Sequence, residues 1–316
     1  MTLLDQIEAC WTKEAEKQSA QWADRLKANK ENFQKAAKQF NEWHPLHVYL
    51  SVTRATKTEM SFGLRYRGQE VASLVVNGDV QLVIKPEVAK KNSYYFGINT
   101  LPGKFKWKSD YAAKFRNDFK KIPPLVLTKI HEHRVESEFL KQMAMDTSEK
   151  FGGTLKHIQP VLWAGCPFQF PLPISGNKGI PKPSKGNIDI LARRGTGKGT
   201  KISIWELKKP VTTANAIEQV YIYAVTLIKM LRSQHNGSGK TWYQDIIGFK
   251  SDVPEQLIIE GVVAVSLDAR ERDKFNLKLQ KFKSENSLAV GNNNVINLYV
   301  AYYQEGPPMT VDVQLV

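Results

Sequence analysis

Apolar side chains recur every three or four positions along residues 3–43, among lysines, glutamates and glutamines. Leu4, Ile7 and Trp22 belong to this pattern. Because an α-helix turns once every 3.6 residues, this spacing places the apolar side chains on one face. The pattern predicts a helical arm that ends before Pro45 and packs on the body of the protein or on a second subunit.

Residues 47–85 follow a different pattern, in which apolar and polar side chains alternate over short stretches. Such alternation is typical of strands with one buried face. Asn77-Gly78 separates two of these stretches, and this pair tolerates the positive φ angles of a two-residue type I′ turn. We therefore expect a small antiparallel β-meander.

Aromatic and basic side chains are interleaved along residues 86–125. Interleaving of this kind suits rings that stack on bases while lysines contact phosphates. Rings packed in a core beside solvated lysines account for the same pattern, and we favour this second interpretation. The aromatic members are Tyr94, Tyr95, Phe96, Phe105, Trp107, Tyr111 and Phe115. Pro123-Pro124 then predicts a boundary between an N-terminal region, 1–125, and a C-terminal domain, 126–316.

From residue 126 onward, helical and extended segments alternate. Helices are expected at 127–147, 214–233 and 269–283, with strands at 156–164, 187–194, 201–208, 257–266, 295–303 and 309–315. This order is typical of an α/β domain in which a mixed β-sheet is flanked by helices. With the N-terminal arm and meander, the whole chain is expected to be α+β.

The net charge of the chain indicates which classes of partner to expect. Lys and Arg number 45 against 31 Asp and Glu, a formal net charge of +14. An excess of this size favours nucleic acid or an anionic membrane surface. Because the basic residues are spread along the chain, they indicate a folded basic surface rather than a disordered tail.

The cysteines and the apolar runs indicate in which compartment of the cell the protein is expected. Cys10 and Cys166 lie far apart without CxxC partners, so neither a zinc knuckle nor a disulfide framework is predicted. The N-terminus becomes polar too early for a signal peptide. The best apolar run, 257–267, is too short for a membrane span and contains Glu260. We expect a cytoplasmic protein with no membrane partner.

The most informative residues are Asp189, Glu206 and Lys208. Asp189 interrupts an apolar strand, and Glu206 and Lys208 project together from the end of the next strand because alternate residues share a face. A charge on a buried face must be paired or must bind metal. The basic loop 193–200 would allow the two strands to pair, which would bring Asp189 near Glu206.

These residue types suit phosphodiester hydrolysis. Two carboxylates on adjacent strands form an oxygen-rich site for Mg²⁺, for which Mn²⁺ can substitute. The metal acidifies a bound water and stabilises the transition state. Lys208 would orient that water or take its proton.

Asp189 followed by Glu206-Leu207-Lys208 resembles the PD-(D/E)xK nuclease superfamily, with Ile188 in place of the proline of the family's name. The similarity covers about residues 127–230. It implies a restriction-endonuclease-like fold in which Asp189 and Glu206 hold the metal and Lys208 positions the attacking water.

The same resemblance implies a further acidic residue on the preceding helix. Glu136 and Glu138 are the two candidates. Val135 and Phe139 belong to the buried stripe of this helix, and Glu136 falls within the stripe while Glu138 falls outside it. We prefer Glu136 as a third metal ligand and leave Glu138 as the alternative.

Gln219 and Tyr223 follow on the next helix, where their i, i+4 spacing places them on one face. They resemble the QxxxY element of several branches of the superfamily, which contributes to the active site. Taken alone, the pair is better explained by a Gln beside an apolar stripe and a Tyr in the core. Its place after the lysine favours the functional interpretation.

The resemblance implies a metal-dependent endodeoxyribonuclease, and by family analogy a bacterial restriction or anti-phage defence effector. Residues 1–125 would recognise a substrate, a partner protein or an activator. The alternative is a catalytically silent nuclease fold that regulates by binding DNA or a partner. DNA is favoured over RNA, and a homodimer is left open.

Overall fold

The computed structural model describes residues 1–38, 46–50, 60–77, 79–122, 132–145, 150–155, 157–208, 214–291, 293–304 and 309–315. The chain forms two compact units. Unit 1 comprises residues 1–28, 139–161 and 169–316, and unit 2 comprises residues 29–138 and 162–168. These units do not coincide with the expected regions 1–125 and 126–316, because residues 1–28 belong to the same unit as the C-terminal sheet and residues 126–138 belong to the other unit.

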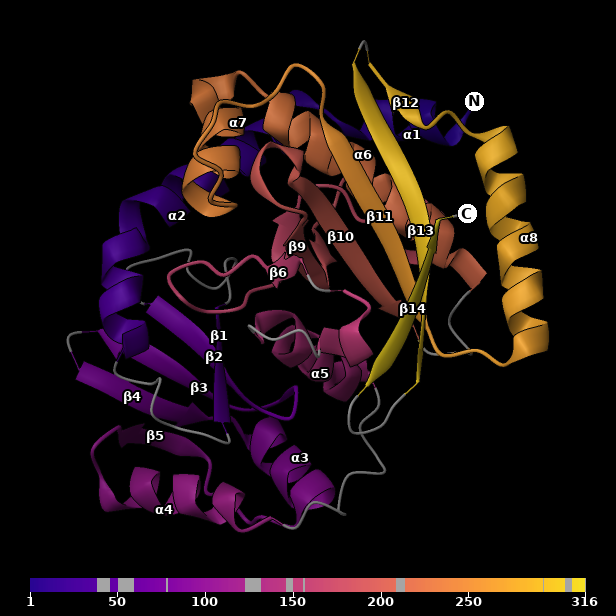
Figure 1. Ribbon diagram of the computed structural model, residues 1–316. Helices are drawn as coiled ribbons and strands as arrows, with labels where there is room; N and C mark the ends of the chain where they lie inside the picture. Colours follow the sequence, from indigo (N-terminus) through magenta and orange to yellow (C-terminus); the bar gives the residue numbers. More distant parts are fainter. Residues whose placement is uncertain are drawn as a thin grey trace. The chain divides into compact units, whose positions relative to one another are not determined.

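A mixed β-sheet forms the centre of unit 1 (Figure 1). Its strands lie in the order β12-β13-β11-β10-β9-β6, with β14 paired to β13. β10, β11 and β13 are parallel, whereas β6, β9, β12 and β14 pair antiparallel with their neighbours. The bounds are β6 Ile158–Pro160, β9 Ile190–Arg194, β10 Lys201–Lys208, β11 Ile258–Val265, β12 Ala289–Val290, β13 Asn294–Gln304 and β14 Thr310–Leu315. The expected mixed sheet flanked by helices is confirmed.

Two helices pack together on one face of this sheet. α6 (Ala216–Arg232) joins β10 to β11, and α8 (Ala269–Glu285) follows β11. The rings of Tyr221 on α6 and Phe282 on α8 lie 5.4 Å apart. Because β10 and β11 are parallel, α6 is the crossover helix that such a connection requires.

The opposite face of the sheet is covered by the C-terminal half of α5 (Glu132–Ala144). Phe139 on this helix contacts Trp205 of β10, with ring centroids 5.7 Å apart. Glu206, the next residue, contacts α6 instead. Both faces of β10 are therefore covered, which explains why its residues from Ile202 to Leu207 are all buried.

α6 is apolar around most of its circumference because other helices cover its outer side. α1 (Leu3–Cys10) contributes Glu8, which pairs with Lys229 of α6. α2 (Lys13–Lys38) begins beside the segment that follows α6, where Trp242 donates a hydrogen bond to Ser19 at 3.0 Å. That segment comprises α7 (Ser238–Lys240) and a π-helical turn, Thr241–Ile246. A helix enclosed on all sides needs no polar face.

Unit 2 is built on the expected antiparallel meander. Its five strands lie in sequence order: β1 Leu46–Leu50, β2 Met60–Tyr66, β3 Gln69–Asn77, β4 Asp79–Ile84 and β5 Gly103–Lys106. α3 (Pro86–Phe96) and α4 (Asp110–Lys120) complete it. β3 and β4 pair around Gly78, which itself lies outside the described residues. A second tight turn joins β2 to β3, where Arg67 and Gly68 have φ angles of 48° and 85°.

Half of the aromatic side chains of residues 86–125 are buried in the core of unit 2. Phe96, Trp107 and Phe115 are buried, and Phe96 contacts Tyr66 with ring centroids 5.2 Å apart. Tyr94, in contrast, is 66% exposed. Core packing is therefore confirmed for the three buried rings.

Several expected elements differ in extent. The helical arm is broken at Trp11, because the hydroxyl of Thr12 accepts a hydrogen bond from the N–H of Ala15 and begins a new helix. The expected strand 156–164 is reduced to β6, since the chain then leaves the sheet and residues 162–168 belong to unit 2. Among the described residues, no helix is long and apolar enough to cross a bilayer.

Replacing Phe139 tests the packing between α5 and the sheet. Phe139 is fully buried and contacts Phe151, Trp205 and Tyr303. Phe139→Ala should lower the free energy of unfolding by about 3–5 kcal/mol, measured by urea denaturation. Leu277→Ala is the control, because Leu277 is 66% exposed on α8, and it should cost less than about 0.5 kcal/mol. Equal losses in the two variants would contradict this packing.

Candidate active site at the end of strand β10

Glu206 is a carboxylate buried at the end of the central strand. It is only 2% exposed. Ile202 and Ile204 precede it on the same face of β10, so the face is apolar until the carboxylate interrupts it. An ionised carboxylate in such surroundings requires compensating donors.

Two donors reach the same oxygen of Glu206. Lys208 Nζ lies 2.6 Å from Glu206 Oε1, and Gln219 Nε2 on α6 lies 2.7 Å from it. Lys208 shares the face of Glu206 because the two residues are one strand repeat apart. The expected placement of Glu206 beside Lys208 is thus observed, and the amide of Gln219 joins the pair.

Asp189 lies at a bend between β8 (Gly186–Ile188) and β9. β8 pairs with β7 (Phe170–Leu172), whereas β9 pairs with β10 as far as Ile190 opposite Trp205. The N–H of Leu207 lies just beyond this last pair and donates a hydrogen bond to Asp189 Oδ2 at 2.9 Å. Asp189 is therefore held against the backbone between Glu206 and Lys208, as the hairpin pairing predicts.

Tyr223 lies one helical turn after Gln219, and its hydroxyl accepts a hydrogen bond from Gln219 Nε2 at 3.1 Å. Burial, reinforced by the negative charge of Glu206, raises the pKa of Tyr223 to about 12. The pair Gln219 and Tyr223 is thus linked directly to the buried carboxylate, which is the arrangement that the i, i+4 spacing predicts.

Two glycines that the sequence analysis did not single out make room for this tyrosine. A Cβ atom at Gly176 would lie 3.2 Å from the ring of Tyr223, and one at Gly186 would lie 3.1 Å from it. At Gly186 that atom would also lie 2.5 Å from the carbonyl oxygen of Ile174. Gly186 stands three residues before Asp189, and no local pattern reveals that a helix side chain packs against it.

Glu136 belongs to unit 2, whereas the other candidate residues belong to unit 1. It is buried, as its place in the apolar stripe predicts, and Glu138 is more exposed. Arg65 Nη1 lies 3.3 Å from Glu136 Oε1, and the guanidinium lies over the ring of Tyr49. Burial and the charge of Glu136 raise the pKa of Tyr49. The role of Glu136 as a metal ligand stays a prediction.

The donors in unit 1 fit a magnesium-type cation. Asp189 and Glu206 supply carboxylate oxygens, and with the ammonium of Lys208 the cluster has a formal net charge of −1. Mg²⁺ commonly binds one or two carboxylates and completes its shell with water and substrate oxygens. Within the described ranges, no three His, Cys, Asp or Glu side chains gather into a metal-binding group. A cation here would therefore depend on waters and substrate.

Comparisons with known proteins add no relative: no protein-family model, no curated protein and no solved structure matches the chain. The interpretation of the cluster therefore rests on its geometry and on the motif itself.

Replacing Tyr223 by Phe tests its burial. The pKa of Tyr223 is higher in the folded protein than in the unfolded protein, where it lies near 10, so the neutral tyrosine stabilises the fold below pH 10. That stability is lost as the pH rises towards the pKa of the folded state. Wild type should therefore lose about 1 kcal/mol more than Tyr223→Phe between about pH 9 and pH 11, measured by denaturation. Tyr94→Phe, at an exposed ring, should follow wild type. A Tyr223→Phe profile that matches wild type would contradict the burial.

Proposed function

We propose that unit 1 is a metal-dependent nuclease that hydrolyses phosphodiester bonds of DNA. The observation that supports it most is the convergence of Asp189, Lys208 and Gln219 on the segment around the buried carboxylate of Glu206. These residues come from two strands and a helix. The fold places two acidic groups, an ammonium and an amide together at one end of the sheet.

In this proposal Asp189 and Glu206 would hold the cation. When bound, a divalent cation lowers the pKa of a water and neutralises charge on the phosphate. Lys208 donates hydrogen bonds to the attacking water or to an oxygen of the scissile phosphate, and so holds one of them in line for the reaction. Gln219 fixes the rotamer of Glu206, and Tyr223 fixes the amide of Gln219.

The net charge of +14 supports a polyanionic substrate. The preference for DNA, and a place in bacterial restriction or anti-phage defence, rest on the resemblance to the PD-(D/E)xK superfamily alone. Mg²⁺ is the proposed cofactor, with Mn²⁺ as a substitute. A partner protein or activator, and a homodimer with one site for each strand, are further proposals of that analogy.

The first test is cleavage of supercoiled plasmid and of single-stranded DNA, with Mg²⁺, Mn²⁺ or EDTA. Wild type should cut with metal and not with EDTA. Lys208→Ala should lower the single-turnover rate by about 10²-fold or more, because it removes the group that orients the reacting atoms.

Lys201→Ala is the matched control for this experiment. It removes the same side chain from the other end of β10, and the nearby Glu260 keeps Arg194 as a partner at 3.4 Å. It should cut at nearly the wild-type rate. Lys208→Ala that cuts as fast as Lys201→Ala would mean that the active site lies elsewhere. A folded wild type that cuts nothing with either metal would favour the silent alternative or a required activator.

A second test measures metal binding separately from DNA cleavage. Mn²⁺ binding, followed by isothermal titration calorimetry, should weaken about tenfold or more in Asp189→Asn and in Glu206→Gln, because each loses an anionic ligand. Glu260→Gln is the control, because Glu260 is a buried carboxylate on the other face of the sheet. Equal affinity in all three variants would exclude Asp189 and Glu206 as ligands.

A further inference from the structure

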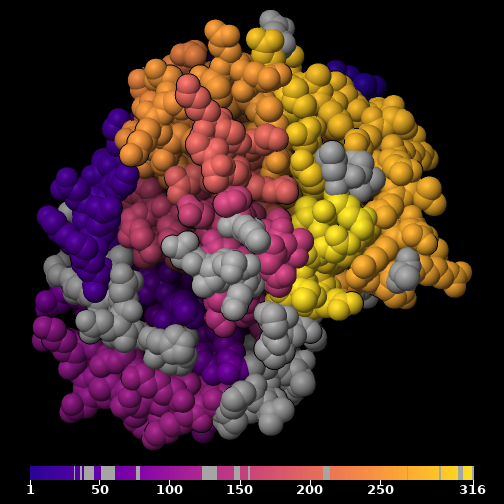
Figure 2. Space-filling view, viewed as in Figure 1, coloured from indigo at the N-terminus to yellow at the C-terminus, as the bar shows by residue number. Residues whose placement is uncertain are grey.

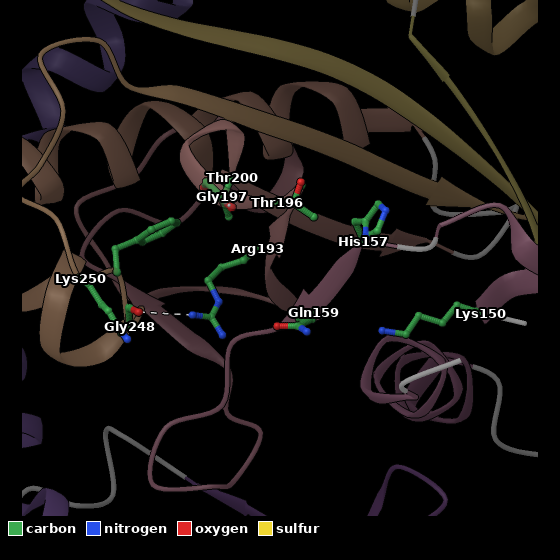
Figure 3. Close-up of a pocket in the computed structure, with 11 residues that line it drawn as sticks. Lys150, His157, Gln159, Arg193, Thr196, Gly197, Thr200, Gly248 and Lys250 are labelled. Atoms are coloured by element: carbon green, nitrogen blue, oxygen red, sulfur yellow. Dashed lines mark hydrogen bonds between the residues drawn. The ribbon is translucent and has the colours of Figure 1, made fainter. Parts of the chain in front are cut away.

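A polar pocket lies in unit 1, at the end of the β9–β10 hairpin away from Glu206. Its cavity has a volume of about 450 Å³, within the usual range for small-ligand sites. The lining comprises Lys150, His157, Gln159, Arg193, Gly195, Thr196, Gly197, Thr200, Gly248, Phe249 and Lys250. Lys150 comes from the 3-10 turn Lys150–Gly153, Gln159 from the middle of the edge strand β6, and His157 is the residue before that strand (Figure 3). The other lining residues come from the hairpin and from the segment that follows the π-helical turn.

The pocket is cationic. Lys150, Arg193 and Lys250 line it together with His157, and none of the described residues in its lining is Asp or Glu. Arg193 and Gln159 are cross-strand neighbours, so their side chains share a face of the sheet. In Figure 3, the side chain of Lys150 extends toward Gln159, whereas the guanidinium of Arg193 is turned toward Gly248. Cations that converge without an acidic partner favour an anionic ligand.

Arg193 retains donors for such a ligand. Its Nη1 donates one hydrogen bond, to the carbonyl oxygen of Gly248 at 3.3 Å. Its buried Nε has no hydrogen-bond partner among the described residues. A guanidinium has five N–H donors in a planar fork that matches two oxygens of a phosphate. Lys150, by contrast, is anchored, since its ammonium donates to the carbonyl oxygens of Met143 and Ile158.

The other residues that line the pocket suit the sugar and the base of a nucleotide, beside its phosphate. The loop 195–200 is largely exposed, lies at the surface in Figure 2 (salmon), and adds the hydroxyls of Thr196 and Thr200 to the pocket. Phe249 is half-buried and stacks on Tyr243 with centroids 4.5 Å apart and an interplanar angle of 9°. A partly exposed ring beside cations is a platform for a base.

We infer that this pocket binds a nucleotide unit, with its phosphate on Arg193 and Lys250 and its base near Phe249. The nucleotide can come from a free ligand such as ATP or from a nucleic-acid strand. Arg193 lies opposite Ile202 on β10, four residues before Glu206, which is roughly 13 Å along the strand. The pocket is therefore separate from the proposed nuclease site, and its occupation does not require that DNA is cut.

The test measures binding rather than cleavage, so a failure of the proposed nuclease leaves it interpretable. Wild type is titrated with ATP by calorimetry, and with a fluorescein-labelled oligothymidylate of about 12 nucleotides by anisotropy, at one fixed salt concentration. The pocket variant is Arg193→Gln with Lys250→Gln. Its control is Lys274→Gln with Lys281→Gln, which makes the same change of charge on the exposed side of α8.

A free nucleotide is the ligand if ATP binds to wild type and to the control, is displaced by inorganic phosphate, and binds about tenfold or more weakly to the pocket variant. A strand is the ligand if only the oligonucleotide weakens by that factor relative to the control. Equal affinities of the pocket variant and the control for both probes would overturn the inference. Lys250→Glu, at an exposed residue, repeats the test should the double variant not fold.

Discussion

The burial of one carboxylate, that of Glu206, constrains how unit 1 is assembled. An ionised group taken out of water must recover its solvation from fixed donors. Lys208 supplies a donor from the same strand and Gln219 supplies another from α6. The second contact fixes which side of α6 faces the sheet, because an amide on any other side could not reach β10. Tyr223 then lies over Gly176 and Gly186, where an added Cβ atom would come within 3.1–3.2 Å of its ring and displace it. The positions of α6, of β10 and of the segments that contain Gly176 and Gly186 thus all depend on the charge of Glu206.

The β9–β10 hairpin has opposite electrostatic character at its two ends. Acidic Asp189 and Glu206 lie at one end, where a cation would be held, and Arg193 lies at the other, beside the loop 195–200. The two proposals assign a metal to the acidic end and a phosphate to the basic end. A rigid pair of strands separates them, since β10 is paired on both sides and buried on both faces. Ligands at both ends would thus be bound independently unless a single strand of nucleic acid spanned the distance.

Local pattern was sufficient to predict the sheet, the helix after Lys208 and the convergence of Glu206, Lys208, Gln219 and Tyr223, because period and spacing determine which side chains share a face. The need for a glycine at Gly176 could not be predicted, since it arises from the side chain of Tyr223, which lies on a helix 40 or more residues later in the chain. The basic pocket was missed for the same reason. Lys150, Arg193 and Lys250 are distant in sequence and only the fold gathers them. The division into units was also unpredicted, because α1 is held to α6 by contacts such as that of Glu8 with Lys229.

The central claim, that Asp189 and Glu206 form a metal site for phosphodiester hydrolysis, is tested most directly by diffraction from crystals soaked in Mn²⁺, with data collected at the manganese absorption edge. The account predicts an anomalous peak within coordination distance, about 2.0–2.2 Å for a cation of this class, of a carboxylate oxygen of each residue. Lys208 should then have moved from Glu206 towards solvent or substrate. Full occupancy of manganese at other residues, with Lys208 still bonded to Glu206, would contradict the account and leave the cluster as an internal ion pair.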